Sequence, residues 1–475
     1  MMANDGVLDR LRANRDRILS KLVEFASIPS VSADPSHAAD VERAARWVAA
    51  EVAAAGPFTV RSVPTAGNPV VYGEWLAAPG KPTLLVYGHY DVQPADPLEK
   101  WHSSPWTPTV RDGRLYARGV SDDKGPMLIP IAVAEAFFAT AGCLPVNVKF
   151  LFEGEEEIGS RHLDAFVQQH KELLAADVVV SADGAMWRID EPSLTVASRG
   201  LCGLEITLAA AAKDLHSGRH GGGVANPLHA IAALVASLHD SNGRVTVAGF
   251  YDDVRELSPD ERAALAALPY DEQAYLAQVG AQSVFGEPGY TTLERQWTRP
   301  TLEVNGMWGG YQGPGHKTII PAEAHAKLTF RLVADQRPED VPDQVRAWVE
   351  ANLPEGIQAE VHAPPGGVAP CASDLDSPWM AALLTSIAQA WDGAPEDVLF
   401  MKEGGSGPEA DLVEQLGAPL VFLGAGLPTD RIHSPNERVL LPMLHRGAEA
   451  AAHLWRELAG ISRPDLVSDR VRPGH

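Results

Sequence analysis

The chain has 475 residues, 45% of them hydrophobic and 21% charged, which is the composition of a folded protein with more than one domain. Its 62 acidic residues outnumber 39 basic ones, and the formal net charge of -23 argues against nucleic acid or an anionic membrane surface as a partner. Three cysteines without a C-x-x-C spacing argue against a disulfide framework or a thiolate zinc site.

The N-terminal segment, residues 1–30, carries charges throughout, so it resembles neither a signal peptide nor a membrane span. Apolar residues from Leu8 to Leu22 recur at helical spacing and predict an amphipathic helix. We therefore expect a soluble, cytoplasmic protein.

Four short apolar runs predict strands that are buried on both faces. They are "TLLVYG" from Thr83, "VNVKFLF" from Val146, "DVVVSA" from Asp177 and "PLVFLG" from Pro419. Helical segments accompany them, such as residues 39–56 before the first run, where Gly56 is the expected stop. Buried strands alternating with helices indicate an α/β fold, a mostly parallel sheet with helices on both faces.

A different pattern begins near residue 201. The strand-like runs "GLEITLAAAA", "TLEVNGMWGGY" and "AHAKLTFRLVA" alternate apolar and polar residues, and the helix-like residues 226–240 and 337–353 lie between or after them. This pattern suits an α+β layer with one solvated sheet face. We predict one α/β domain from residues 1–200 and 372–475, interrupted by an inserted domain over residues 201–371.

Histidines and carboxylates follow the predicted parallel strands or lie in a nearby loop. In open α/β sheets the functional site lies beyond the carboxyl ends of such strands. Each motif alone could be a surface pair, a turn or a helix start, but their joint occurrence at strand ends favours a site. In chain order they are His89, Asp91, Asp122, Asp123, the glutamates of "EGEEE" at 153–157, Asp183 and His433.

These side chains predict a metal site. Imidazole and carboxylate ligands without thiolates suit zinc, manganese or another first-row divalent ion. The carboxylates exceed what one tetrahedral ion needs, which favours two ions about 3.5 to 4 Å apart that share a bridging carboxylate. Other chemistries fit less well: "GGSGP" around Ser406 departs from the G-x-S-x-G pattern, and "GPGHKT" departs from the phosphate-loop pattern.

Eight motifs follow one another along the chain from residue 89 to residue 437. They are "HYDVQPAD", "YARGVSDDKGP", "EGEEEIGS", "SADG", "KDLHSG", "KTIIPAEAHAKLTFRLV", "EGGSGP" and "HSPNE". Together they resemble the dinuclear zinc metallopeptidase family of carnosine dipeptidases, aminoacylases and succinyl-diaminopimelate desuccinylases. The resemblance is strongest to the dipeptidase branch. It implies a zinc-exopeptidase-like catalytic domain with an inserted lid and dimerisation domain.

The resemblance also implies two divalent ions per subunit, zinc foremost, with manganese or cobalt as alternatives. Asp122 would bridge both ions. His89 and Asp183 would complete one metal site, and Glu157 and His433 the other.

The same resemblance assigns catalytic and substrate-binding roles. Asp91 would orient His89, and Glu156 would be the general base for a two-metal-bridged water. The inserted domain would form a homodimer and place His216 in the partner's site, where it would bind substrate and stabilise the oxyanion. Arg331 would hold the substrate carboxylate. Ser406 and Thr318 would be further substrate contacts.

The predicted function is metal-dependent hydrolysis of dipeptides or small peptides. An amidohydrolase of N-acyl amino acids would share the metal ligands and differ in the pocket for the acyl group. A noncatalytic, peptide-binding relative is the third interpretation. The motifs assign no role to Glu153 or Glu155.

Overall fold

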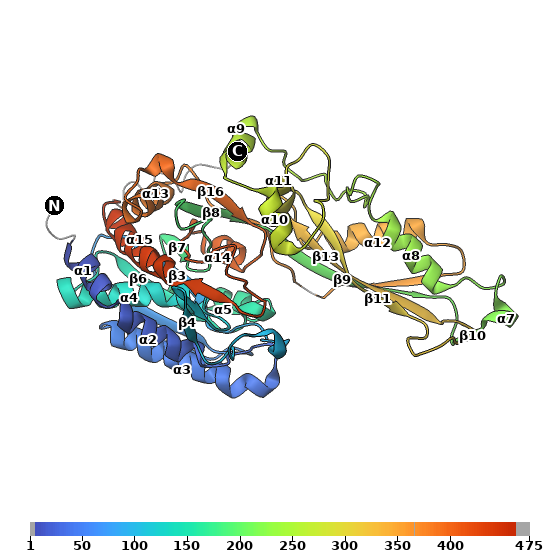
Figure 1. Ribbon diagram of the computed structural model, residues 1–475, viewed down its shortest axis with the longest axis horizontal. Coiled ribbons are helices and arrows are strands. Elements are labelled where there is room, and N and C mark those ends of the chain that lie inside the picture. The colour runs from blue at the N-terminus through green and yellow to red at the C-terminus, as the bar shows by residue number, and fades with distance from the viewer. Residues whose placement is uncertain (1–4, 365, 462–475) are drawn as a thin grey trace. The chain divides into compact units, whose positions relative to one another are not determined.

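The computed structural model describes residues 5–364 and 366–461, which divide into two compact units (Figure 1). Within these ranges, unit 1 comprises residues 5–197, 372–401 and 408–461. Unit 2 comprises residues 198–371 except 365, together with residues 402–407, a segment that the sequence-based boundaries placed in the catalytic domain. Each unit has its own hydrophobic core.

A mostly parallel sheet forms the centre of unit 1, in the order β1-β2-β6-β3-β7-β17. Neighbours from β6 to β17 run parallel, whereas β1 and β2 form an antiparallel edge. The four apolar runs form β3, β6, β7 and β17, so the predicted fold class is confirmed. The strands are β1 (Thr59–Val63), β2 (Val70–Trp75), β3 (Thr83–His89), β6 (Asn147–Glu153), β7 (Val178–Ser181) and β17 (Leu420–Phe422).

Helices cover both faces of this sheet. Val86 and Phe150 belong to the core shared with α3, α4, α13 and α15. Their neighbours Leu85 and Lys149 point to the opposite face, where the Lys149 ammonium donates to two carbonyls at the end of α6. The helices of unit 1 are α1 (Asp5–Ala13), α2 (Arg15–Ala26), α3 (Ala38–Ala55), α4 (Lys124–Ala141), α5 (Leu163–Gln169), α6 (Lys171–Leu174), α13 (Pro378–Ala390), α14 (Glu409–Leu416) and α15 (Leu441–Ala459).

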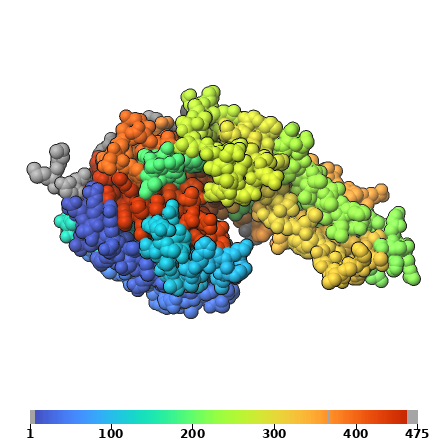
Figure 2. All heavy atoms as spheres, in the orientation of Figure 1, coloured from blue at the N-terminus to red at the C-terminus, as the bar shows by residue number. Residues whose placement is uncertain are grey.

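The predicted N-terminal helix is two helices, α1 and α2, separated at Asn14. Asparagine favours caps and turns over helix interiors, which explains the break. Figure 2 shows these blue segments beside the red C-terminal helix, where Arg12 donates two hydrogen bonds to Glu449 of α15. Burial would raise the pKa of Glu449, but Arg12 outweighs it and holds that pKa below its usual range.

Among the described helices, α4 alone is long and apolar enough to cross a bilayer, and 72% of its apolar window is buried. It connects the loop that holds Asp122 to β6. This burial is what a core helix of the sheet requires.

An antiparallel sheet forms the centre of unit 2, in the order β11-β13-β9-β14. Residues of β9 and β13 alternate between buried and partly exposed, as the sequence predicted, and α8 and α12 contribute to the buried side. The elements are β9 (Gly200–Ala209), β10 (Leu215–His216), α7 (Ser217–His220), α8 (Pro227–Ser237), α9 (Pro259–Ala267), α10 (Glu272–Val279), α11 (Thr292–Trp297), β11 (Thr301–Gly309), β12 (Ile319–Ile320), β13 (Glu323–Leu332), α12 (Val341–Asn352) and β14 (Gln358–His362).

The remaining strands are short. β18 (Arg438–Leu440), β5 (Arg114–Tyr116) and β4 (Thr109–Arg111) form one small sheet, and β15 (Cys371–Ala372), β8 (Ser193–Ser198) and β16 (Leu399–Glu403) form another. β10 pairs with β12. The first of these sheets joins the loop before Asp122 to the loop that carries His433.

Candidate metal centre

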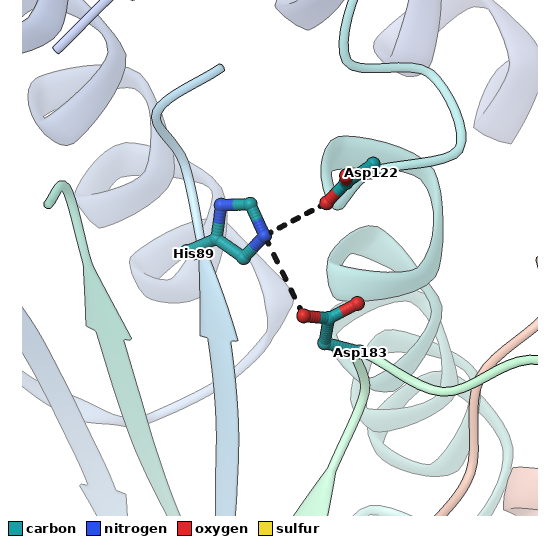
Figure 3. Close-up of side chains that lie close together, drawn as sticks. All are labelled: His89, Asp122 and Asp183. Atoms are coloured by element: carbon teal, nitrogen blue, oxygen red, sulfur yellow. Dashed lines mark hydrogen bonds and ion pairs between the residues drawn. The ribbon is translucent and has the colours of Figure 1, made fainter. Parts of the chain in front are cut away.

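The first cluster of ligands lies at the carboxyl ends of β3 and β7, as Figure 3 shows. His89 is the last residue of β3, Asp183 follows β7, and Asp122 precedes α4. The Nε2 atom of His89 lies 3.1 Å from Oδ1 of Asp122 and 3.8 Å from Oδ2 of Asp183. One atom from each residue can be chosen so that all three lie within 4.8 Å of one another.

The second cluster shares Asp122 with the first. Nε2 of His433 lies 2.9 Å from Oδ2 of Asp122 and 3.1 Å from Oε2 of Glu157. The two oxygens of Asp122 therefore face different clusters, Oδ1 toward His89 and Oδ2 toward His433. A carboxylate that offers one oxygen to each of two sites is the arrangement of a dinuclear centre.

Asp91 supports residues of both clusters. Its side chain is fully buried, and Oδ1 lies 3.4 Å from Nδ1 of His89, which also lies 3.2 Å from the carbonyl oxygen of Asp91. The same carboxylate accepts hydrogen bonds from the backbone N–H groups of Glu156 (3.3 Å) and Glu157 (3.1 Å) and from the hydroxyl of Ser32 (2.6 Å). It therefore fixes the glutamate turn as well as the imidazole that the sequence analysis paired with it.

Gln93 holds Glu157, a contact that the sequence analysis missed. Its backbone N–H donates to Oε1 of Glu157 at 3.1 Å, and its side-chain amide donates to Oε2 at 2.8 Å. Gln93 stands in the quoted motif "HYDVQP", but an uncharged amide has no metal-ligand signature. Its position in a motif was the only signal.

Glu437, the last residue of "HSPNE", holds the loop before α4. Its buried carboxylate accepts from the backbone N–H groups of Gly119 (2.9 Å), Ser121 (3.0 Å) and Asp122 (3.2 Å), and from Arg118 at 2.6 Å. Burial raises the pKa of Glu437 to about 7 against the opposing charge of Arg118. Four donors on one carboxylate fix the backbone of Asp122, a role that the sequence analysis did not find.

His433 lies in a loop with an unusual backbone. Arg431, His433 and Asn436 all have positive φ, which non-glycine residues seldom adopt. The side chain of Asn436 accepts from the backbone of residue 102 and donates to the carbonyl of residue 100, which ties the loop down. Such backbone conformations concentrate at functional sites, where the surrounding structure enforces them.

The raised pKa values in the two clusters show that these side chains favour bound positive charge. Hydrogen bonds to Asp122 and Glu157 raise the pKa of His433 to about 10. Burial, followed by the charge of Asp122, raises the pKa of Asp183 to about 8. Burial and three neighbouring carboxylates raise the pKa of Glu156 well above its usual range. Divalent cations supply such charge, because they replace the protons that these groups otherwise retain.

Glu153 and Glu155 have partners of their own. Glu153 accepts hydrogen bonds from the hydroxyls of Tyr87 (2.9 Å) and Ser160 (2.8 Å), and Glu155 lies 2.7 Å from Nδ1 of His162. Burial raises the pKa of Glu153 to about 8. These contacts brace the turn that carries Glu156 and Glu157.

The four remaining predicted residues belong to unit 2 and form two groups. Arg331 donates to the hydroxyl of Ser406 at 2.8 Å. His216 and Thr318 lie close in the backbone, since β10 pairs with β12 and Ser217 N–H donates to the carbonyl of Thr318. Nδ1 of the exposed His216 accepts from the N–H of residue 218 at 3.0 Å, which leaves Nε2 as the protonated nitrogen.

Comparison with known proteins decides the family. The model of peptidase family M20/M25/M40 matches residues 85–457, which is more than half of the chain. The chain belongs to this family. It is a peptidase, and the resemblance predicted from the motifs is confirmed.

Three relatives show how far the similarity extends. The Cys-Gly metallodipeptidase of Schizosaccharomyces pombe is 31% identical over 97% of this chain and 99% of its own length. The metallo-carboxypeptidase structure from Sulfolobus solfataricus has a TM-score of 0.84 at 31% identity and covers 94% of this chain and 99% of that one. Human carnosine dipeptidase 1 has a TM-score of 0.83 at 28% identity, with 97% and 100% covered. The peptidase therefore matches these relatives along nearly its whole length.

Proposed function

We propose that this peptidase hydrolyses dipeptides or other small peptides with a free carboxylate, and that it requires two divalent metal ions. The observation that carries the proposal is the position of Asp122, whose two oxygens each face a separate histidine and carboxylate. Relatives named as Cys-Gly and carnosine dipeptidases support the choice of dipeptides.

In this proposal His89, Asp122 and Asp183 hold one ion, and Asp122, Glu157 and His433 hold the other. The nitrogen and oxygen donors, without sulfur, suit zinc first and manganese or cobalt as alternatives. Two such ions, when bound, polarise the scissile carbonyl and lower the pKa of water. Asp91 keeps His89 and the Glu156–Glu157 turn in position for them.

Glu156 serves as the general base. It accepts a proton from the attacking water and delivers it to the departing amine. The adjacent glutamates differ in setting: Gln93 and His433 bind the carboxylate of Glu157, whereas no described residue hydrogen-bonds the carboxylate of Glu156. A carboxylate free of such partners can accept a proton as a base, and a tethered one suits a ligand.

Substrate recognition is assigned to unit 2. Arg331 holds the terminal carboxylate, with Ser406 and Thr318 as further contacts. His216, with Nε2 as donor, stabilises the oxyanion in the partner subunit of a homodimer formed through the inserted domain. Mixing His216→Ala protein with Glu156→Ala protein tests whether His216 acts in the partner's site. Partial recovery of activity supports that role, and no recovery despite demonstrated subunit exchange contradicts it.

The alternative function is deacylation of N-acyl amino acids, which needs the same metal ligands. A panel of free dipeptides and N-acetyl amino acids, assayed on protein loaded separately with zinc, manganese and cobalt, separates the two. The proposal predicts that dipeptides with a free amino terminus are hydrolysed best. Preference for N-acetyl amino acids would replace it with the deacylase function. We also propose a cytoplasmic location, and the acidic charge argues against nucleic-acid or membrane partners.

A further inference from the structure

Two arginines of unit 2 lie near the same end of its antiparallel sheet. Arg331 in β13 stands directly opposite Leu201 in β9, and Arg199 immediately precedes β9, two residues before Leu201. The charge of Arg331 acts on Arg199 and both side chains contact one loop, so the two arginines are neighbours. Two like charges at this spacing repel each other unless an anion lies between them.

Both guanidinium groups contact the loop of residues 404–406. Arg199 donates from Nε to the carbonyl of Gly404 at 3.2 Å and from its backbone N–H to the carbonyl of Gly405 at 3.0 Å. Arg331 donates from Nη1 to the hydroxyl of Ser406 at 2.8 Å. The loop therefore binds both arginines through neutral acceptors and forms an ion pair with neither.

Among the described residues, no carboxylate lies within 4.0 Å of a nitrogen of Arg199 or Arg331. The Nη1 atom of Arg199 is buried and has no hydrogen-bond partner in this part of the chain. Oε1 of Glu403, the acid whose charge acts on both arginines, already accepts from the N–H groups of Gly404 and Gly405.

Burial, followed by the charge of Arg331, lowers the pKa of Arg199 to about 10. A buried cationic group with an unmet donor carries a substantial free-energy penalty, which a bound anion would relieve. The site suits a group with two oxygens and one negative charge, because a guanidinium can donate two parallel hydrogen bonds to a carboxylate.

We propose that Arg199 joins Arg331 in a two-arginine site that binds the terminal carboxylate of the peptide, and that Arg199 determines the preference for free acids over amides. This inference rests on the proposed function. The alternative is that Arg199 only braces the 404–406 loop, in which case its removal would impair all substrates alike.

The test compares a free dipeptide with the same dipeptide carrying a C-terminal amide. Steady-state kinetics are measured for the wild type, Arg199→Gln and Arg199→Lys, with Arg46→Gln as a matched control because Arg46 is exposed on α3 and pairs with Glu42 on that helix. Loss of a charge-assisted hydrogen bond should raise KM for the free acid about tenfold or more in Arg199→Gln. The amide should change by less than about twofold, and Arg199→Lys should retain part of the preference.

Equal increases in KM for the free acid and the amide in Arg199→Gln would overturn the inference. Arg199 would then only hold the 404–406 loop in place. If the wild type hydrolyses neither compound, the proposed function fails, and isothermal titration of the same two compounds against wild type and Arg199→Gln still decides the inference. Weaker binding of the free acid alone supports the two-arginine site. Unchanged or equally weakened binding of both compounds contradicts it.

Discussion

Replacing Asp91 with alanine should weaken both metal sites at once. The Asp91 carboxylate accepts hydrogen bonds from Ser32, Glu156 and Glu157 and lies 3.4 Å from Nδ1 of His89. The substitution therefore removes the support of one residue in each proposed metal site. By contrast, His89→Ala removes a ligand from one cluster only.

The magnitude follows from the contacts that are lost. The three donors are partly buried, so each one left without its acceptor costs about 1 kcal/mol, the lower end of the usual range, and together they lower the free energy of unfolding of the metal-free protein by roughly 3 kcal/mol. Loss of a group that orients metal ligands typically costs about 10- to 100-fold in metal affinity. We expect such a loss at both sites in Asp91→Ala.

Urea unfolding of the metal-free protein measures the first effect, and competition with a chromophoric chelator measures the second. Asp91→Asn is the matched variant, because its remaining oxygen can still accept part of the hydrogen bonding. An unfolding free energy within about 1 kcal/mol of wild type would contradict the reasoning, because three partly buried donors should together cost more. Weakening of a single metal site would also contradict it.

Three further predictions concern other carboxylates. Glu437→Gln should lower the free energy of unfolding by about 2 kcal/mol or more, since it weakens four hydrogen bonds on a buried acceptor; an unchanged urea midpoint would refute this. Glu156→Ala should keep both metals and lose most turnover, whereas Glu157→Ala should lose one metal; equal metal loss in the two variants would disprove the division of roles. Glu449→Gln should cost about 1 kcal/mol at pH 7, measured against the exposed control Glu42→Gln. Because the folded pKa of Glu449 is lowered, this difference is present above its unfolded pKa of about 4.3 and should vanish as pH falls through the folded pKa. A difference that persists in acid would refute the pairing.

The central sheet was predictable because its parallel strands are buried on both faces. The apolar runs of β3, β6, β7 and β17 stand out in the sequence for that reason. Strand β1 lies at the edge in antiparallel pairing with β2, is mostly exposed, and carries no such run. The break at Asn14 was missed because the apolar spacing continues through it, and periodicity does not register a single residue that leaves the helix.

The meeting of His89 and Asp183 was predictable from their places at strand ends, because those ends meet at one edge of a parallel sheet, whereas Asp122 lies in the loop before α4 and was assigned through the family resemblance. The supporting contacts were not. Gln93 and Glu437 act through backbone and amide hydrogen bonds, and these depend on the path of loops that residue spacing does not specify. Pairing of the two unit-2 arginines likewise depends on strand register, which the sequence alone left open.

The metal stoichiometry of the wild type and of Asp122→Ala tests the central claim most directly. Metal-free protein would be loaded with zinc, freed of excess ion, and measured by inductively coupled plasma mass spectrometry alongside dipeptide hydrolysis. A shared Asp122 predicts two ions per chain in the wild type, and loss of both ions and of activity in Asp122→Ala. One ion in the wild type, or two ions retained in Asp122→Ala, would contradict the account.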